Sequence, residues 1–255
     1  MTRVLTERHG RVLHLINNAP DKRNALDFDY YDAVIAALDA AGDDIGAVVL
    51  SGAGHFFCAG GDLKGLKARS EKDFAGRREG VDRLHGLIRA IRACPKPVIA
   101  AVDGGAAGAG ASLAAACDLI VAAEDAYVIL AYVKIGLTPD GGATWFYGRG
   151  LPPQLTAEMA ITGGKMPAAR LYQAGFINRI APVAVDAALE WAAEIANGAP
   201  HSMAAIKGLL GQAQTNSLEE QLEAEAQGIG TALGGAEGKE GINAFLEKRK
   251  ANFHG

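Results

Sequence analysis

The sequence has few cysteines, little charge imbalance and no long apolar run, and each shortage excludes a class of protein. Its three cysteines lie far apart and form no Cys-x-x-Cys pair, so we do not expect a disulfide framework. The net charge of -4 gives no broad positive field, so nucleic acid is not expected as the main partner. No apolar run has the length of a membrane span, and the first residues lack the apolar stretch of a signal peptide. These features predict a cytoplasmic protein with reduced thiols and no membrane partner.

Several catalytic and cofactor-binding motifs are also absent. The sequence contains no G-x-x-x-x-G-K-[ST] phosphate loop, and Ser112 does not lie in a G-x-S-x-G nucleophile elbow. Gly108-Ala109-Gly110 resembles the start of a dinucleotide-binding fingerprint, but that pattern requires glycine where Leu113 stands. No group of histidines has the spacing of a metal site, so we expect no metal ion.

The distribution of apolar residues predicts an α/β protein. Hydrophobic residues make up 49% of the chain, which suffices for one sizeable core. A hairpin is predicted over residues 4–17, and short apolar runs predict buried strands at 47–50, 97–102 and 119–121. Each of these three strands leads through a loop toward a helix, and helical spacing of apolar residues follows Phe28 and again residues 81–91.

The second half of the chain differs from the first, because its pattern after Leu151 is almost wholly helical. The stretch 197–202, NGAPHS, is the best linker candidate, and it predicts a core of residues 1–197 followed by a helical region of residues 198–255. The last predicted helix carries Glu237 in its first turn and Lys248 in its last turn. This arrangement of charges favours the helix dipole.

Two glycine-rich loops follow predicted strands, namely Ala59-Gly60-Gly61 and residues 104–110. Ligands of α/β proteins bind at the carboxyl ends of strands, where a loop without side chains lets them approach the backbone. A helix that starts in such a loop also presents free N–H groups. Two amides that converge on one carbonyl oxygen would form an oxyanion hole.

Asp140 lies between Pro139 and two glycines, just before a predicted helix, and two interpretations of it are open. It either caps the helix or acts as a carboxylate in a binding site. Apolar neighbours, which include Ile135, Leu137 and Trp145, would raise its pKa in the second case.

Four motifs, in this order, resemble the crotonase, or enoyl-CoA hydratase/isomerase, family. They are HFFCAGGDL, PKPVIAAVDGGAAGAGASLAAACDLIVAAEDA, IGLTPDGGATW and GINAFLEKRKANFHG. The resemblance covers nearly the whole chain. It implies a spiral of ββα units that binds an acyl-CoA thioester, followed by a helical region that assembles homo-trimers, often paired into hexamers. It also implies that coenzyme A is part of the substrate, so no separate cofactor is expected.

The resemblance assigns the two oxyanion amides to Gly61 and Ala109. Family hydratases hold water between two glutamates, whose positions here are occupied by Ser112 and Tyr132. Neither serine nor tyrosine is a good base near neutral pH, so ordinary hydratase chemistry is not expected. Asp140 aligns with the aspartate that epoxyphenylacetyl-CoA and dienoyl-CoA isomerases use as a proton-transferring base. In 4-chlorobenzoyl-CoA dehalogenases an aspartate at that place is the nucleophile.

Other positions take their expected roles from the same resemblance. His85 aligns with a histidine of the dehalogenase-like branch, although a helix histidine also suits a structural role. Tyr132 is either an aromatic wall or a hydroxyl donor, and Cys58 is expected to fill space in its loop. Asp62 is expected to orient its own loop, and the segment 64–80 to contribute to the far wall of the pocket. Contacts with coenzyme A are expected from Lys22, Arg23, Ala59, Gly60, Asp62, Leu63 and, across a subunit boundary, Phe245 and Lys248.

We therefore expect an acyl-CoA isomerase in which the Gly61 and Ala109 amides hold a thioester enolate while Asp140 moves the proton. The alternatives are a hydratase with an atypical site, or a hydrolase or dehalogenase with Asp140 as nucleophile. A protein that binds acyl-CoA without catalysis, or that associates with RNA, is the alternative from another class.

Overall fold

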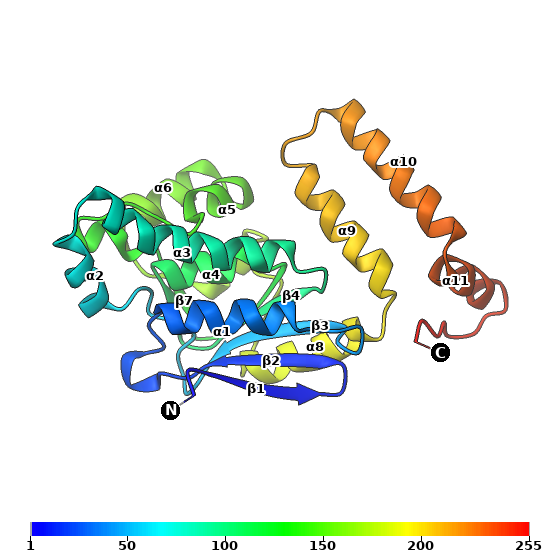
Figure 1. Ribbon diagram of the computed structural model, residues 1–255, viewed down its shortest axis with the longest axis horizontal. Helices are drawn as coiled ribbons and strands as arrows, with labels where there is room; N and C mark the ends of the chain where they lie inside the picture. The colour runs from blue at the N-terminus through cyan, green and yellow to red at the C-terminus, as the bar shows by residue number, and fades with distance from the viewer. Residues whose placement is uncertain (1, 255) are drawn as a thin grey trace.

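The computed structural model describes residues 2–254 and contains two β-sheets with helices packed around them (Figure 1). The larger sheet has the order β1-β2-β3-β4-β6-β9; only the β1–β2 hairpin in it is antiparallel. The smaller sheet has the order β5-β7-β8. The strands are β1 (Val4–His9), β2 (Val12–Asn17), β3 (Ala47–Gly52), β4 (Val98–Val102), β5 (Gly105–Ala107), β6 (Leu119–Ala123), β7 (Tyr127–Ile129), β8 (Met166–Pro167) and β9 (Arg179–Ala181).

Helices cover the larger sheet, and α9, α10 and α11 stand apart from it (Figure 1). Helix α8 packs along β2, β3, β4 and β6, whereas α1 and α3 pack against each other. The helices are α1 (Phe28–Asp39), α2 (Leu63–Ser70), α3 (Phe74–Ala93), α4 (Ala109–Ala116), α5 (Ala143–Gly150), α6 (Pro153–Thr162), α7 (Ala168–Gln173), α8 (Ala184–Ala196), α9 (Pro200–Gln212), α10 (Leu218–Gly234) and α11 (Ala236–Leu246), with short 3-10 helices η1 (Pro20–Lys22) and η2 (Ala131–Ile135).

The central strands β3 and β4 are buried almost throughout, as expected of parallel strands that are covered on both faces. Helix α3 shows the complementary pattern, since Leu84, Leu87, Ile88 and Ile91 are buried on one side of it. The predicted hairpin and all three predicted strands are confirmed. The α/β class inferred from their alternation is therefore correct.

The structure adds detail to two secondary-structure predictions and corrects a third. Helix α3 begins at Phe74, several residues before its apolar pattern, because Asp73 accepts a hydrogen bond from Gly76 N at 2.9 Å and caps the helix there. The region after Leu151 is almost wholly helical, as predicted; its strands, β8 and β9, are too short to form a recognisable apolar run. Lys248 lies beyond the end of α11 with a φ of 56°, so it does not complement the dipole of that helix.

Within residues 2–254, no helix combines the length and the apolar composition that crossing a membrane would require.

Candidate active site

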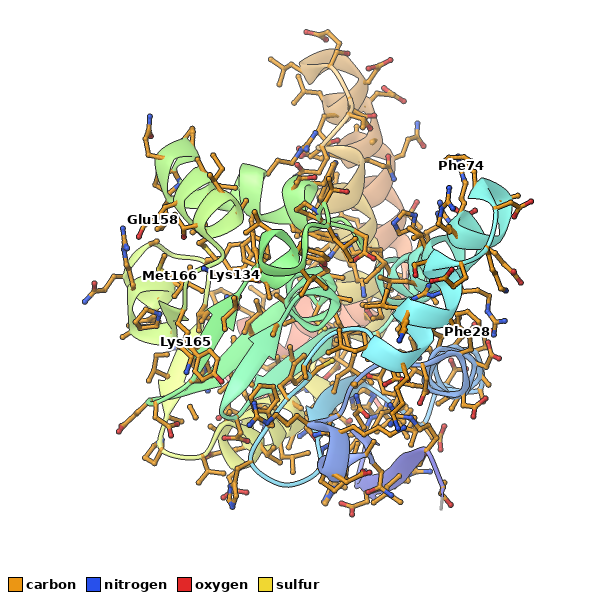
Figure 2. The ribbon with its side chains drawn as sticks, turned by 90° about the vertical axis from the view of Figure 1, so that its left-hand side faces the viewer. Phe28, Phe74, Lys134, Glu158, Lys165 and Met166 are labelled. Carbon is orange, nitrogen blue, oxygen red and sulfur yellow. The ribbon has the colours of Figure 1, made fainter. Side chains whose placement is uncertain are left out.

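The loops that follow β3 and β4 border a cavity of about 470 Å³, to which α1, α2, α3 and η2 also contribute side chains. Figure 2 shows Lys134, which lines this cavity from η2, on the opposite side of the view from Phe28 at the start of α1. Most of the predicted site residues line it: Lys22, Ala59, Gly60, Gly61, Asp62, Leu63, Ala109, Tyr132 and Asp140.

The two glycine loops approach each other closely at Gly60. This residue has a φ of +93°, and a Cβ placed on it would lie 2.8 Å from the Ala107 carbonyl oxygen and 3.3 Å from Ala109 N. Ala109 is the first residue of α4, where the N–H group has no partner inside the helix. Among the described residues, neither Gly61 N–H nor Ala109 N–H donates a hydrogen bond. Two free donors therefore border the cavity from adjacent loops, which is the arrangement that an oxyanion hole requires.

Asp140 does not cap a helix. The N-cap of α5 is Gly142, which has a φ of 80°, and no side chain accepts a hydrogen bond from the first turn of that helix. Instead, Asp140 Oδ1 accepts a hydrogen bond of 2.8 Å from the Tyr132 hydroxyl. The following Gly141 also has a positive φ, and a Cβ placed on it would meet Ser112 Cβ at 2.8 Å. The two glycines thus permit a tight turn that directs the Asp140 carboxylate into the cavity.

Ser112 and Tyr132 form a buried hydrogen-bond network with Asp140. Ser112 Oγ lies 2.9 Å from the Tyr132 hydroxyl and 2.9 Å from the Asp140 carbonyl oxygen. Burial is the main cause that raises the pKa of Tyr132, so this hydroxyl stays protonated and remains a donor. The Tyr132 hydroxyl donates to Asp140 and Tyr132 also lines the cavity, so its two predicted roles do not exclude each other. Ser112 belongs to the network but does not line the cavity.

The electrostatic surroundings of Asp140 suit a proton-transferring carboxylate. Burial raises the pKa of its carboxyl group, and the hydrogen bond from Tyr132 and the charges of His85 and Arg69 oppose this shift without cancelling it. Ile135 and Leu137 line the cavity beside it, as predicted. Trp145 does not line the cavity. It packs edge-on against Phe146 and lies under Arg149.

Four other predicted site residues are not brought into the cavity of this chain. His85 lies on α3 outside the cavity lining, and a positive charge on it would lower the pKa of Asp140. The guanidinium of Arg23 lies over the Phe56 ring, 5.8 Å from its centroid. Phe245 and Lys248 belong to the C-terminal tail and do not line the cavity.

Two neighbouring residues of the first loop behave as expected. Asp62 accepts a hydrogen bond of 3.2 Å from Gly65 N and caps α2, so it orders its own loop. Cys58 is fully buried, and burial raises the pKa of its thiol to about 12. A thiol that remains protonated is a poor nucleophile, which agrees with a space-filling role.

Sequence reasoning missed Tyr31 and Leu84, whose apolar spacing indicated only a core face. Both line the cavity. It expected a contribution from the segment 64–80 but not from particular residues, and the structure identifies Lys64, Leu66, Arg69 and Gly80.

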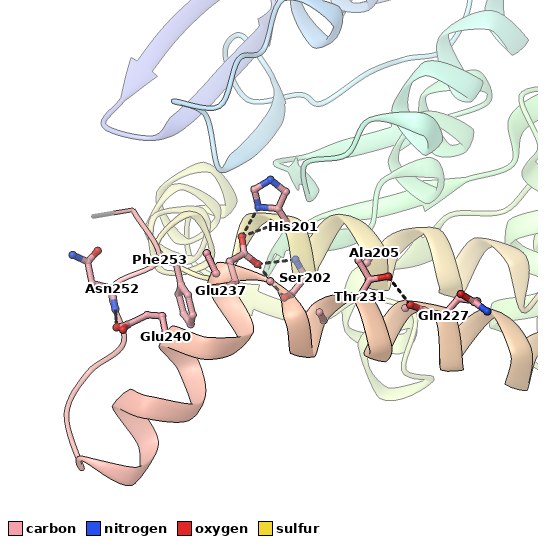
Figure 3. Close-up of a pocket in the computed structure, with 13 residues that line it drawn as sticks. His201, Ser202, Ala205, Gln227, Thr231, Glu237, Glu240, Asn252 and Phe253 are labelled. Atoms are coloured by element: carbon pink, nitrogen blue, oxygen red, sulfur yellow. Dashed lines mark hydrogen bonds and ion pairs between the residues drawn. The ribbon is translucent and has the colours of Figure 1, made fainter.

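A larger hollow of about 810 Å³ lies between α9, α10 and α11 (Figure 3). There the Glu237 carboxylate accepts hydrogen bonds from His201 N and Ser202 N, and so caps the start of α9. None of the predicted catalytic residues lines this hollow. It is therefore a gap between helices of the C-terminal region and not the candidate active site.

A group of possible metal ligands also lies outside the cavity, although the sequence spacing indicated none. Ligand atoms of Glu7, His9 and His14 all lie within 4.8 Å of one another. The hairpin register, which pairs Glu7 with His14, brings them together. None of the three lines the cavity, so we assign them no part in its chemistry.

The sheets, the ββα connections and the C-terminal helices together define a crotonase fold. An enoyl-CoA hydratase from Polaromonas sp. JS666 has the same architecture, with a TM-score of 0.95 and 41% identity over 98% of both chains. The sequence model of the Enoyl-CoA hydratase/isomerase family matches residues 7–255. The chain belongs to the enoyl-CoA hydratase/isomerase family, whose members act on acyl-CoA thioesters.

Similar proteins within the family have different activities. A probable enoyl-CoA hydratase of Rhodobacter capsulatus is 38% identical over 92% of this chain and 91% of its own length. The 1,2-epoxyphenylacetyl-CoA isomerase of Escherichia coli is 32% identical over 99% of this chain and 98% of its own length. Overall similarity therefore does not distinguish hydratase from isomerase.

Proposed function

We propose that this protein is an acyl-CoA isomerase that moves a double bond, or rearranges an unsaturated or ring-derived acyl group, through a thioester enolate. One observation carries the proposal. Ser112 and Tyr132 occupy the two positions where the family hydratases have glutamates. These two residues form a hydrogen-bond network with Asp140, which lines the cavity as a single carboxylate. A single carboxylate suits proton transfer between two carbons better than activation of water. We also propose that coenzyme A enters as part of the substrate and that no separate cofactor is needed.

In this mechanism the thioester oxygen lies between the free amides of Gly61 and Ala109. When Asp140 removes a proton from the carbon beside the thioester, negative charge moves onto that oxygen and both amides stabilise it. Asp140 then returns the proton to a different carbon, which completes the isomerisation. Its raised pKa makes the carboxyl group a better match for both transfers.

Two other reactions at the same site are the alternatives. A hydratase is favoured by the activity of the Rhodobacter relative, and would add water to the substrate without a second carboxylate. A hydrolase or dehalogenase would use Asp140 as a nucleophile. A dehalogenase would form an aspartyl ester with the aromatic ring as the halide leaves, and a hydrolase would form a mixed anhydride as the CoA thiolate leaves.

A screen of enoyl-, dienoyl- and aryl-CoA esters in deuterated water distinguishes these reactions. The isomerase produces an isomer of the starting ester, with deuterium at the newly protonated carbon to the extent that the proton on Asp140 exchanges with solvent before it is returned. A product that has gained one water would establish a hydratase, and a covalent Asp140 adduct trapped by mass spectrometry, ester or anhydride, would establish the nucleophilic mechanism. Binding of every ester without turnover would contradict all three.

Removal of the Tyr132 hydroxyl should change how the activity depends on pH. Its hydrogen bond lowers the pKa of Asp140, so Tyr132→Phe should raise that pKa further. Asp140 must be ionised to accept a proton, so kcat/KM rises with pH through its pKa and then becomes constant. In the variant this rise should occur at higher pH, and turnover near neutral pH should fall roughly 10-fold. A pH profile with an unchanged acid limb would show that Tyr132 does not act on Asp140.

We also propose that residues 198–255 form an oligomerisation region that builds a homo-trimer, or a hexamer of two trimers. Helices α9 and α10 expose Leu210, Ile229 and Leu233, and Phe245 at the end of α11 is 84% exposed. Such side chains favour burial against another copy. Phe245 and Lys248 would then reach the coenzyme A bound by a neighbouring subunit. The mass in solution should be a multiple of three subunits, and a stable monomer at micromolar concentration would contradict the assembly.

A further inference from the structure

Arg69 lines the candidate active site, and among the described residues its guanidinium forms no ion pair and donates no hydrogen bond. It lies on α2, one turn beyond Leu66, and both side chains line the cavity. The guanidinium lies over the Phe28 ring, whose centroid is 5.9 Å from the guanidinium carbon. The side chain is half-buried. A half-buried cation that lacks an anionic partner is unfavourable unless a ligand supplies one.

Arg69 lines the same cavity as Asp140 and Tyr31. Burial raises the pKa of both of these groups, and the charge of Arg69 opposes both shifts. Asp140 marks the place where the acyl carbons react. Arg69 therefore faces the acyl group, whereas Lys22 and Lys64 line the cavity from η1 and the start of α2.

Gly80 creates the space that Arg69 occupies. This glycine is buried in α3, and a Cβ placed on it would clash with Arg69 Nη1. Any side chain at position 80 would thus displace the guanidinium from its present position. The backbone of Gly80 is helical and requires no glycine for its conformation. Because Gly80 has no side chain, the Arg69 guanidinium can occupy this space.

We propose that Arg69 binds a carboxylate at the distal end of the acyl group, so that the preferred substrates are unsaturated acyl-CoA esters with a terminal carboxylate. The planar guanidinium fits a carboxylate with two parallel hydrogen bonds. This inference rests on the proposed acyl-CoA isomerase function, because it concerns the selectivity of the same cavity.

The test compares two esters of equal chain length, one ending in a carboxylate and the other in a methyl group, over a series of lengths. At the best length the wild type should prefer the carboxylate by roughly 10- to 100-fold in kcat/KM, the usual value of a charged hydrogen bond. Arg69→Gln should abolish this preference. Gly80→Ala should reduce it as well, although the arginine is still present.

Arg83 provides a matched control. Its guanidinium also lies over the Phe28 ring, at 4.5 Å, but it is already paired with Asp32 at 2.6 Å and does not line the cavity. Arg83→Gln should keep the preference. If Arg69 only tuned Asp140, its loss would slow both esters equally and leave their ratio unchanged, and that result would overturn the inference.

A binding measurement separates this inference from the proposed function. It uses saturated forms of the same two esters, which can bind but have no double bond to move. Tighter binding of the carboxylate-ended ester by the wild type, lost in Arg69→Gln, supports the carboxylate site even if no isomerisation is observed. Equal binding of both esters overturns the site even if isomerisation is observed.

Discussion

Replacing Asp140 by asparagine should lower turnover by about 10²–10⁴-fold, the usual contribution of a general acid–base residue. Asparagine has nearly the same shape, and its amide oxygen can still accept the hydrogen bond that the Tyr132 hydroxyl now donates to Asp140 Oδ1. It cannot take up a proton near neutral pH. Steady-state kinetics should therefore show a large loss in kcat, while the melting temperature and the affinity for a saturated acyl-CoA stay near those of the wild type.

Ser112→Ala is the control for that result. It removes a buried hydroxyl that lies 2.9 Å from both Tyr132 and the Asp140 carbonyl oxygen, but it leaves the carboxylate in place. Its effect on turnover should be less than about 10-fold, in keeping with the loss of one neutral hydrogen bond. If Ser112→Ala reduced turnover as much as Asp140→Asn, the network and not proton transfer by Asp140 would be limiting.

Gly60→Ala should reduce kcat/KM by roughly 10²–10³-fold, the effect of losing one oxyanion-hole donor. The new methyl group would lie 2.8 Å from the Ala107 carbonyl oxygen and 3.3 Å from Ala109 N, so one of the two loops must move. Either movement shifts the Gly61 or the Ala109 amide away from the thioester oxygen. Kinetics on a confirmed substrate measure the loss, and the melting temperature reports how far the fold is affected.

Gly175→Ala separates this effect from backbone strain. Gly175 has a similarly positive φ of 79°, but no atom lies within 4 Å of an added Cβ there. The strain at this turn should lower the melting temperature and leave kcat/KM unchanged. Equal losses of activity in the two variants would contradict an oxyanion hole at Gly61 and Ala109.

The fold was largely predictable because most elements carry their own local signal. The β3 and β4 strands are continuous apolar runs, and the glycine loops after them mark the edge of the sheet where the cavity lies. The short strand β9 could not be predicted, because its three residues are stabilised by pairing with β6 and not by a pattern of their own. The end of α11 was predicted too late in the chain, because the basic residues taken to mark its last turn lie beyond Leu246, where the helix ends.

The site was predictable only in part. Motif positions identified Asp140 and the two loops, but the choice between helix cap and free carboxylate depended on the turn at Gly141 and Gly142. The role of the Tyr132 hydroxyl likewise depended on how η2 packs against that turn. Arg69 was not identified because its place in the cavity depends on a glycine eleven positions later in the chain, on a different helix.

Exchange of carbon-bound hydrogen with solvent tests most directly whether Asp140 moves a proton in an enolate mechanism. The substrate is an arylacetyl-CoA, which has acidified protons beside the thioester and no movable double bond, and nuclear magnetic resonance follows its uptake of deuterium. We predict exchange at that carbon with the wild type, and exchange slower by about 10² or more with Asp140→Asn at equal binding. Exchange at the same rate in both proteins, or none in the wild type although the ester binds, would contradict the mechanism.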